Sequence, residues 1–424
     1  MTGPKEHPRL ALVLLAAIST VGFIDRIIMN VLVEPLKKEF TLSDAQIGVI
    51  NGLAFAALNV GLGLVVARLA ERRHRIGLIA LGTLLWSIAT AACGLVGSAA
   101  QLLLARIGVG VGEAVGLPAT SSVLSDLFPR EKRVTVMAVL NLAPPLGAFI
   151  GATGGGLIAQ LYGWRHAFLI AAIPGVLLAG ALMLLIREPE RGRQDGGPAP
   201  DVPSVWAVMS RYFAWPTMRH MLIGSTIAGL VGFGLNGFFA AYMARRFGFS
   251  LAAAGTVSGL VASLPAAISI IGAGWLSDKL AARGNRRGYA LICAVTLAIS
   301  APLYAFAITR DDPALLIALV TLCALIQFTY LGLTAGTFQN MLSPRMRATG
   351  TAFTGVIYTL VSGGFGPLLL GLVSDHYAAA GIAPGVALGY AMASMAALYL
   401  WAALHYALAA RTIEKDLARP IEHG

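Results

Sequence analysis

Charged residues are scarce in this sequence. They make up 12% of its 424 residues, whereas 57% are hydrophobic, and the mean hydropathy is +0.77. Because soluble domains carry roughly 25% charged residues, this composition excludes a soluble domain, a disordered chain and a coiled coil. The apolar residues form long blocks, many above the roughly 18 residues that indicate a membrane-spanning helix. The short alternating segments of a membrane β-barrel are missing. The sequence therefore predicts a polytopic α-helical membrane protein.

Cysteine is scarce as well. Cys93, Cys293 and Cys323 lie far apart in apolar segments and form no C-x-x-C pair, which argues against a disulfide framework and a zinc site. The histidines show no metal-ligand spacing, so we expect no metal and no cofactor. Two glycine-rich strings, GVGVGEAVG (108–116) and GATGGG (151–156), lie inside apolar blocks rather than after a strand. They predict close helix packing and not a dinucleotide-binding loop.

Twelve apolar blocks are long enough to span a membrane. The first follows Lys5 and Arg9 and has no small-residue cleavage site, so we expect a retained helix rather than a signal peptide. The predicted spans are 10–33, 45–70, 76–97, 101–127, 133–160, 164–187, 219–244, 251–277, 288–309, 313–339, 348–374 and 385–410.

One long break, residues 188–218, divides the chain. It begins with EPERGRQDGGPAPDVP, a Gly-, Pro- and charge-rich composition typical of a flexible linker. The following SVWAVMSRYFAW (204–215) predicts either an interfacial helix or a packed part of the linker. We expect the chain to consist of four parts: an N-terminal six-helix bundle (1–187), a cytoplasmic linker (188–218), a C-terminal six-helix bundle (219–410) and a cytoplasmic tail (411–424).

The basic residues are strongly asymmetric across the predicted topology. Of the 31 Lys and Arg residues, 23 fall on the side of the two termini, six on the opposite side and two, Arg26 and Arg106, inside spans. The positive-inside rule therefore places both termini in the cytoplasm of an inner or plasma membrane. This placement also explains the net charge of +11. The basic residues mark topology and anionic headgroups, so we expect no nucleic-acid partner.

Two loops near the ends of spans repeat each other. GLVVARLAERRHR (63–75) aligns with GWLSDKLAARGNRR (274–287) at an offset of 211 residues, close to half the chain. FPREKRVTVMA (128–138) and LSPRMRATGTA (342–352) follow the fourth and tenth spans in the same way. Two six-helix halves joined by a linker are the architecture of many secondary transporters, in which the substrate binds between the halves.

The repeated loop resembles the signature loop of the major facilitator superfamily. The first copy, with Gly63 and Arg68, departs from the pattern because Ala67 stands at the position of the family's aspartate. In the family this aspartate latches helix ends in the outward-facing state, so its absence puts that latch in doubt in the N-terminal half. The resemblance implies that these loops are cytoplasmic gates. The second copy matches well at Gly274, Asp278, Lys279, Arg286 and Arg287.

A closer resemblance lies in the first and fourth spans. GFIDRIIMNVLVEPLKKEF (22–40) and LLLARIGVGVGEAVGLPATSSVLSDLFPREKR (102–133) are similar to the spinster-like lipid transporters. Anion:cation symporters of the same superfamily carry similar strings, so this second assignment stays open. The spinster-like resemblance implies movement of a lysophospholipid or a sphingosine-phosphate-like substrate with proton-linked gating.

Four formal charges lie well inside the predicted spans: Asp25, Arg26, Arg106 and Glu113. A charge near a helix centre costs about 2.5–3.5 kcal/mol on insertion scales, so such residues face a bundle interior or a pathway. Residues 106, 110 and 113 share one helix face, whereas the adjacent residues 25 and 26 do not. A static salt-bridge set between the first and fourth spans is the structural alternative.

Charge counting favours a functional reading. With both carboxylates ionised the four charges cancel, and one proton leaves a net positive charge that attracts an anionic headgroup. Burial favours the neutral carboxyl and a neighbouring arginine favours the charged form, so the dominant effect is left open. We expect Asp25 and Glu113 to accept protons and act as the switch. We expect Arg26 and Arg106 to bind the headgroup or to pair with those carboxylates.

The C-terminal half lacks these charges. At the offset of 211, Asp25 corresponds to Asn236, Arg106 to Ile317 and Glu113 to Ala324. We expect an apolar and neutral polar cavity wall there, although ordinary helix packing explains each residue equally well. The candidate lining residues are Asn236, Phe238, Gln327, Tyr330 and Tyr358.

The sequence thus predicts a secondary transporter that works by alternating access, moves an amphiphilic lipid in a proton-linked way and acts as a monomer. The alternative is a proton-coupled transporter of small organic anions or drugs on the same fold. An intramembrane enzyme would need a nucleophile motif or a metal site, neither of which is found, so we expect no enzyme. A nutrient sensor would need a long soluble signalling domain, and the absence of one from this sequence disfavours that alternative.

Overall fold

The structure is a computed structural model that describes residues 7–62, 74–190, 204–343 and 345–419. Within these ranges the chain is helical and forms no strand, which confirms the predicted all-α membrane fold. Contacts divide the chain into two compact units. Unit 1 comprises residues 1–198 and 237–259, and unit 2 comprises residues 199–236 and 260–424. The four-part division predicted from the sequence stays a prediction.

Eleven helical stretches of the described residues are long and apolar enough to cross a membrane. The remaining predicted span, the fourth in chain order (101–127), is present as two shorter helices, α6 (Ala99–Glu113) and α7 (Gly116–Leu127). The interruption follows Glu113 directly. Pro118 has no amide hydrogen, so it cannot pair with the carbonyl four residues earlier, and the helix opens at that point. The break lies next to one of the four charges predicted inside the spans.

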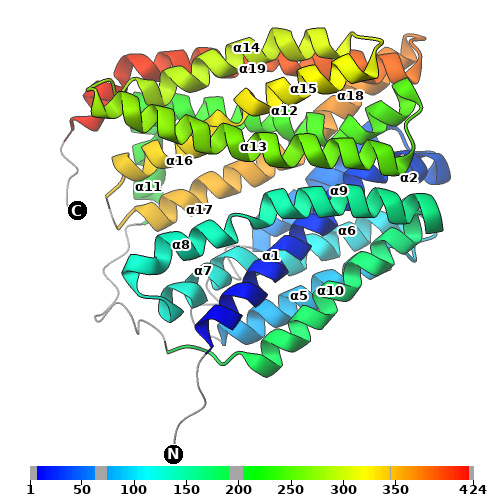
Figure 1. Cartoon of the computed structure of the whole chain (residues 1–424), viewed down its shortest axis with the longest axis horizontal. Coiled ribbons are helices and arrows are strands. Elements are labelled where there is room, and N and C mark those ends of the chain that lie inside the picture. The colour runs from blue at the N-terminus through cyan, green and yellow to red at the C-terminus, as the bar shows by residue number, and fades with distance from the viewer. Residues whose placement is uncertain (1–6, 63–73, 191–203, 344, 420–424) are drawn as a thin grey trace, which may run out of the picture. The chain divides into compact units, whose positions relative to one another are not determined.

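Unit 1 contains the first half of the chain (Figure 1). Two of its helices, α3 (Asp44–Gly48) and α6, begin at serine caps: the Ser43 hydroxyl accepts a hydrogen bond from the Gln46 amide, and the Ser98 hydroxyl accepts one from the Gln101 amide. The remaining elements are α1 (Pro8–Val31), α2 (Val33–Phe40), the π-helical turn η1 (Val49–Leu53) within a stretch that runs to Leu62, α5 (Arg75–Cys93), α8 (Arg130–Leu140), α9 (Ala143–Tyr162) and α10 (Trp164–Leu185).

Glycines bring α9 against α1. A Cβ at Gly147 would lie 2.4 Å from Cβ of Phe23, and one at Gly151 would lie 2.9 Å from the carbonyl oxygen of Ile24. Gly155 meets Ile28 in the same way, at 2.7 Å. These glycines recur every four residues, so they form one stripe on α9. The expectation that the glycine-rich strings serve close helix packing is confirmed for 151–156, and this packing fixes the rotation of α1 around residues 25 and 26.

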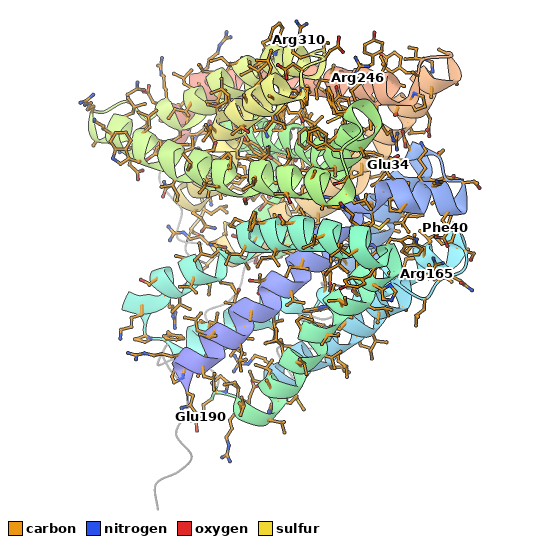
Figure 2. The ribbon with its side chains drawn as sticks, turned by 45° about the vertical axis from the view of Figure 1, so that its right-hand side comes forward. Glu34, Phe40, Arg165, Glu190, Arg246 and Arg310 are labelled. Carbon is orange, nitrogen blue, oxygen red and sulfur yellow. The ribbon has the colours of Figure 1, made fainter. Side chains whose placement is uncertain are left out.

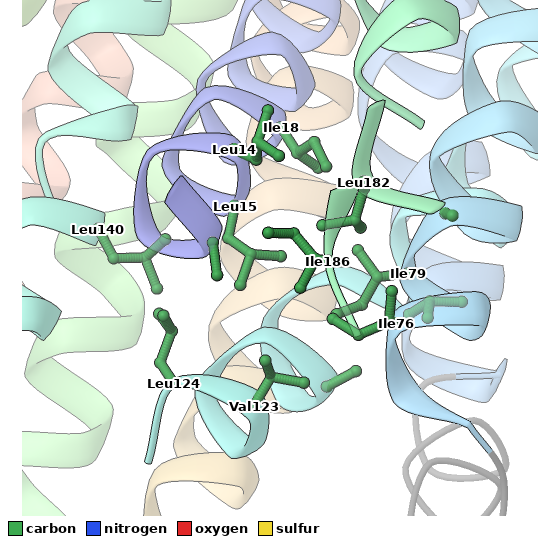
Figure 3. Close-up of a cluster of buried hydrophobic side chains, with 14 of the residues drawn as sticks. Leu14, Leu15, Ile18, Ile76, Ile79, Val123, Leu124, Leu140, Leu182 and Ile186 are labelled. Carbon is green, nitrogen blue, oxygen red and sulfur yellow. The ribbon is translucent and has the colours of Figure 1, made fainter. Parts of the chain in front are cut away.

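The hydrophobic core of unit 1 joins α1 to α5, α7, α8 and α10 (Figure 3). Leu15, Val123 and Leu182 are fully buried in it. In a membrane, such side chains hold helices together through close van der Waals packing rather than through removal from water. The core therefore holds α1, with Asp25 and Arg26, and α5, with Thr90, in a fixed arrangement.

Unit 2 contains the other helices of the chain (Figure 1). Helices α12 (Pro216–Phe247) and α13 (Leu251–Ala282) contribute residues to both units. A helix forms in the predicted linker, α11 (Val205–Ala214). The other elements are α14 (Gly288–Ile308), α15 (Pro313–Gln327), α16 (Thr329–Met341), α17 (Arg347–Ile357), the π-helical segment η2 (Tyr358–Gly364), α18 (Phe365–Ala379) and α19 (Pro384–Leu417).

The loop predicted at 274–287, after the eighth span, is helical over its first part. Gly274, Asp278 and Lys279 lie on α13, because nothing in that stretch breaks the helix before Ala282. The helix ends near Gly284, whose φ of +84° suits glycine. Arg287 does lie outside the helices, at the start of α14. Gly63 and Arg68 are outside the described residues.

Candidate functional site

The four predicted intramembrane charges come together in unit 1, Asp25 and Arg26 from α1 and Arg106 and Glu113 from α6. Arg26 donates from Nε to Oε2 of Glu113 at 2.6 Å, and its Nη2 also pairs with that oxygen. The Arg26 side chain is 38% exposed, whereas that of Glu113 is 4% exposed. Arg26 is therefore the accessible end of this ion pair and Glu113 its buried end.

Aromatic rings surround the two guanidinium groups. The Cζ atom of Arg26 lies 5.2 Å from the ring centroid of Phe23 and 4.7 Å from that of Phe55. Arg106, which is only 1% exposed, lies 5.8 Å from the same Phe55 ring. A phenyl ring within about 6 Å attracts a cation through its quadrupole. Phe55 thus helps to hold both positive charges in one place.

Asp25 faces a different neighbour from Arg26. Its Oδ2 accepts a hydrogen bond of 3.2 Å from the Thr90 hydroxyl of α5, and the residue is 1% exposed. Glu113, Arg106 and Arg26 are all within electrostatic range of it. The two carboxylates therefore have separate partners: Glu113 pairs with Arg26, and Asp25 with Thr90.

Three polar atoms of this cluster are buried without a hydrogen-bond partner among the described residues. They are Oδ1 of Asp25, Oε1 of Glu113 and Nε of Arg106. Most buried polar atoms in proteins are paired, so unpaired ones need an explanation. A carboxyl oxygen without a donor is chemically suited to carry a proton. A guanidinium nitrogen without an acceptor is suited to meet an anion.

The local backbone explains how Phe55 reaches the arginines. A Cβ at Gly110 would lie 2.7 Å from the carbonyl oxygen of Phe55, so only glycine allows this approach of α6. Asn59 donates to the Gly110 carbonyl at 3.2 Å one turn further along. The turn η1 directly precedes Phe55, and there the Asn51 amide donates to Asn30 at 2.7 Å. π-Helical turns are rare and recur at functional sites.

Taken together, the cluster holds two cationic and two acidic side chains. Two arginines and two ionised carboxylates cancel, and a single proton on either carboxyl leaves a net charge of +1.

Three of the five predicted cavity-lining residues belong to a polar network in unit 2. The hydroxyl groups of Tyr330 and Tyr358 are 2.9 Å apart, and Tyr399 donates to Gln327 at 3.2 Å. A Cβ on Gly232 would come within 3.9 Å of both the Tyr330 and the Tyr399 hydroxyl oxygens, so the two pairs lie against the same point of α12. The network is polar and formally uncharged.

The other two predicted lining residues are not part of this network. Phe238 is fully buried and belongs to unit 1. Asn236 is half-buried at the edge of unit 2. Phe238 thus has the environment of an ordinary packing residue, while a lining role for Asn236 stays a prediction.

Ion pairs gather at the helix ends on the basic-rich side. Arg75, which is 2% exposed, donates to Asp126 at 2.5 Å and to Glu188 at 2.6 Å. In unit 2, Arg287 pairs with Glu414 at 3.1 Å. The Arg75 contacts were not predicted, since their partners are 51 and 113 residues away in the chain.

Two further predicted gate residues, Asp278 and Lys279, are exposed. Lys279 lies with Nζ 4.9 Å from the Trp275 ring, on the same helix, and Asp278 beside it is exposed. Their gating role stays a prediction.

The opposite end of unit 1 also carries a buried cation. Arg245 at the end of α12 is 7% exposed and donates to Glu34 at 2.5 Å and to both oxygens of Asp44 at 2.7 Å. Lys37 also binds Asp44, at 2.6 Å. Arg245 was predicted only as a topology marker, because nothing in the sequence connects it to residues some 200 positions earlier.

Glu39 forms an exposed ion pair at the same end. Arg165 donates to its two oxygens at 3.0 and 2.6 Å, and the Trp164 indole donates at 2.7 Å. The hydrogen bonds from Arg165, and then that from Trp164, lower the pKa of Glu39 below its ordinary value. Figure 2 shows Glu34, Phe40 and Arg165 at this end of unit 1 and Glu190 at the other. The charged side chains outside the central cluster therefore mark the two ends of the helices.

The described residues offer no group of three or more His, Cys, Asp or Glu that could hold a metal ion. The sequence also gave no sign of Thr90 or Phe55 as site residues. Threonine and phenylalanine are common in membrane helices, and their roles depend on which helices are neighbours.

The chain was compared with known proteins. The model of the Major Facilitator Superfamily matches residues 14–367. An MFS-type efflux pump of Mycolicibacterium smegmatis is 32% identical over 410 residues, which cover 95% of this chain and 92% of that protein. The sphingosine-1-phosphate transporter SPNS2 of Danio rerio is 24% identical over 412 residues, or 91% of this chain and 80% of the relative.

A solved structure agrees with these relatives. The inward-facing crystal structure of a bacterial homologue of the human lysosomal transporter spinster superposes with a TM-score of 0.87 at 28% identity. The alignment covers 99% of this chain and all of that one. The fold and sequence thus agree over almost the entire length. The chain belongs to the major facilitator superfamily of transporters, and spinster homologues are among its relatives.

Proposed function

We propose that this transporter moves an anionic amphiphile, of the lysophospholipid or sphingosine-phosphate kind, in a proton-linked way by alternating access. The observation that carries the proposal is the Arg26–Glu113 pair, exposed at its cationic end and flanked by Phe23 and Phe55. A phosphate headgroup binds arginine through two parallel hydrogen bonds. Apolar rings beside the same guanidinium suit the first carbons of an acyl chain.

The proton would act through competition. In the ionised state, Glu113 occupies the Nε and Nη2 donors of Arg26. Protonation of the unpaired Oε1 would remove the negative charge that competes with the headgroup. A proton on Oδ1 of Asp25 would raise the charge of the cluster in the same direction. Substrate binding and proton binding would then favour each other, as linkage requires.

The neutral network of unit 2 supports the same proposal. Gln327, Tyr330 and Tyr358 offer hydrogen-bonding groups without formal charge. The name of the zebrafish relative, a sphingosine-1-phosphate transporter, is consistent with an amphiphilic phosphate.

A second candidate function has its own support. The M. smegmatis relative is named an efflux pump, which favours a small organic anion or drug as substrate. The same arginines would bind such an anion, but the binding would not depend on a long chain. Chain length therefore separates the two candidates.

We also propose that the protein works as a monomer in an inner or plasma membrane, with both termini in the cytoplasm. The support is the distribution of basic residues, 23 on the side of the termini against six on the other. Arg75 and Arg287, with their ion pairs, lie on the basic-rich side.

The test is transport of a labelled lysophospholipid in proteoliposomes with and without a pH gradient, for wild type, Asp25→Asn and Glu39→Gln. We expect the wild type and Glu39→Gln to respond to the gradient and Asp25→Asn to lose that response. If lysophospholipid moves but neither the gradient nor Asp25→Asn has an effect, the proton linkage is refuted. If only short-chain organic anions move, the second candidate replaces the first.

A further inference from the structure

A cluster of arginines and aromatic residues lies at one corner of unit 2, away from the intramembrane charges. It is formed where α11 ends, α12 begins and α19 ends, and consists of Arg211, Trp215, Arg219 and Arg419. The Cζ atom of Arg211 lies 4.5 Å from the Trp215 ring centroid and that of Arg419 lies 5.3 Å from it. These two positive charges can be no farther apart than the sum of those distances. We call this set the arginine corner.

The positive charges of the arginine corner are only partly balanced. Arg419 pairs with Asp416 at 3.2 Å, and Asp416 also accepts the Thr217 amide. Besides the Trp215 ring, Arg211 contacts the sulfur of Met346, 3.6 Å from Nη1, and its Nε has no hydrogen-bond partner among the described residues. Within the described part of the chain, Arg219 donates only to a main-chain oxygen, that of Phe213, at 3.3 Å. Like charges this close repel each other unless an anion lies between them.

The direction of the Arg219 side chain places its charge with the others. Arg219 is in the first turn of α12, and its bond to Phe213 carries the guanidinium back toward the end of α11. Long basic side chains extend in this way toward the headgroup layer of a membrane. The Arg219 guanidinium therefore lies near the end of α11, where Arg211 and Trp215 also lie.

Helix α11 has the features of a helix that lies along a membrane surface. Val208 and Tyr212 are buried, and Tyr212 packs on Phe338 and Phe353 with ring centroids 4.9 and 5.3 Å apart. Trp206 and Phe213, seven residues apart and so on one side of the helix, are 75% and 48% exposed. An anchored helix with exposed aromatic residues and arginines at its end suits the interface between headgroups and acyl chains.

The surface below the arginine corner is suited to an acyl chain. His220 of α12 and His405 of α19 meet with their Nδ1 atoms 3.0 Å apart, and Trp401 packs against His405. Trp401 and Leu404 are more than half exposed on α19, deeper in the span. A molecule with a phosphate at the arginines would extend its chains along this apolar surface.

From this combination we infer that the arginine corner binds the phosphate of an anionic membrane phospholipid, whose chains lie along α19. The occupant is a bilayer lipid and not the transported substrate, because the corner lies at a helix end and is built from residues separate from the Arg26–Glu113 pair. The lipid would hold α11, and with it the start of α12, at the membrane surface. Basic residues near a membrane attract anionic headgroups in this manner.

The test is a native mass spectrometry titration of the full chain with phosphatidylglycerol and with phosphatidylcholine. Wild type, Arg211→Gln/Arg219→Gln and the matched control Arg283→Gln/Arg286→Gln are compared. The control removes two exposed arginines from the basic-rich side of the same unit. We expect the wild type and the control to prefer phosphatidylglycerol, and the corner variant to lose roughly tenfold or more of that preference. Arg211 and Arg219 form no ion pair with any residue that the structure describes, so the variant should keep the melting temperature of the wild type.

A second measurement locates the lipid. Phosphatidylglycerol brominated on its chains should quench the tryptophan fluorescence of the wild type more than brominated phosphatidylcholine does, and the corner variant should lose most of that difference. The inference is overturned if the corner variant keeps the wild-type preference or if the control loses as much. It is also overturned if soluble glycerol phosphate competes as strongly as the lipid, since the corner would then bind a free anion.

Discussion

Replacing Glu113 by glutamine should strengthen the binding of an anionic amphiphile. In the ionised protein, Oε2 of Glu113 holds two donors of Arg26, at 2.6 Å for Nε. Hydrogen bonds to a charged group contribute about 1.5–3 kcal/mol, and the partial exposure of Arg26 places this pair toward the lower end. A headgroup that needs Arg26 must overcome that interaction. Its removal should therefore improve binding by about 2 kcal/mol, or roughly thirtyfold.

The assay is equilibrium binding of a labelled lysophosphatidic acid to purified protein, with a neutral monoacylglycerol measured in parallel. The wild type should bind the anion roughly thirtyfold more weakly than Glu113→Gln at neutral pH, because its carboxylate competes for Arg26. The neutral amphiphile should bind both proteins alike.

Glu39→Gln is the matched control, since it removes a carboxylate that also binds an arginine in unit 1 but lies at the exposed helix end. It should bind like the wild type. Equal or weaker binding of the anion by Glu113→Gln would refute the reasoning, because Glu113 would then not compete for Arg26.

Three further outcomes follow from the packing and the ion pairs. Gly110→Ala should lower the melting temperature by several degrees and reduce transport, because its Cβ would meet a main-chain oxygen at 2.7 Å, whereas Gly116→Ala, with open space around it, should do neither. Arg245→Gln should destabilise the protein by about 3–5 kcal/mol in chemical denaturation, since two carboxylates lose their buried partner, and Lys37→Gln should cost clearly less. Glu39 has a lowered pKa in the folded state, so its stabilisation is present above its ordinary pKa and is lost as the pH falls through the lowered one. The melting-temperature gap between the wild type and Glu39→Gln should therefore narrow from about pH 6 to about pH 3.5, and an unchanged gap would contradict this.

The helical architecture could be predicted from the sequence because membrane spans depend on length and hydropathy, which are local properties. The exceptions are also instructive. The span predicted at 101–127 is interrupted after Glu113, because Pro118 cannot donate a hydrogen bond to the carbonyl of Ala114. Asp278 and Lys279 were expected in a loop and lie in α13, because no helix breaker follows before Gly284.

The site could be predicted only in part. Charges inside spans stand out by their energetic cost, so Asp25, Arg26, Arg106 and Glu113 could be named in advance. Their pairing could not, since a helical face specifies direction but not the neighbouring helix. Thr90 and Phe55 carry no charge and give no such signal. They become site residues through the positions of α5 and of the helical stretch that contains η1.

The π-helical turn before Phe55 has a consequence for how this site tolerates change in chain length. A π-turn holds more residues than an α-turn, so η1 behaves like a one-residue insertion within an otherwise regular helix. Deleting one residue between Val49 and Leu53 would let the α-helix close and would turn everything beyond it by about 100°. Phe55 would then leave both guanidinium groups although no member of the cluster had been substituted. Related chains that differ by a gap at this turn should therefore differ in substrate binding, even where all four charged residues are retained.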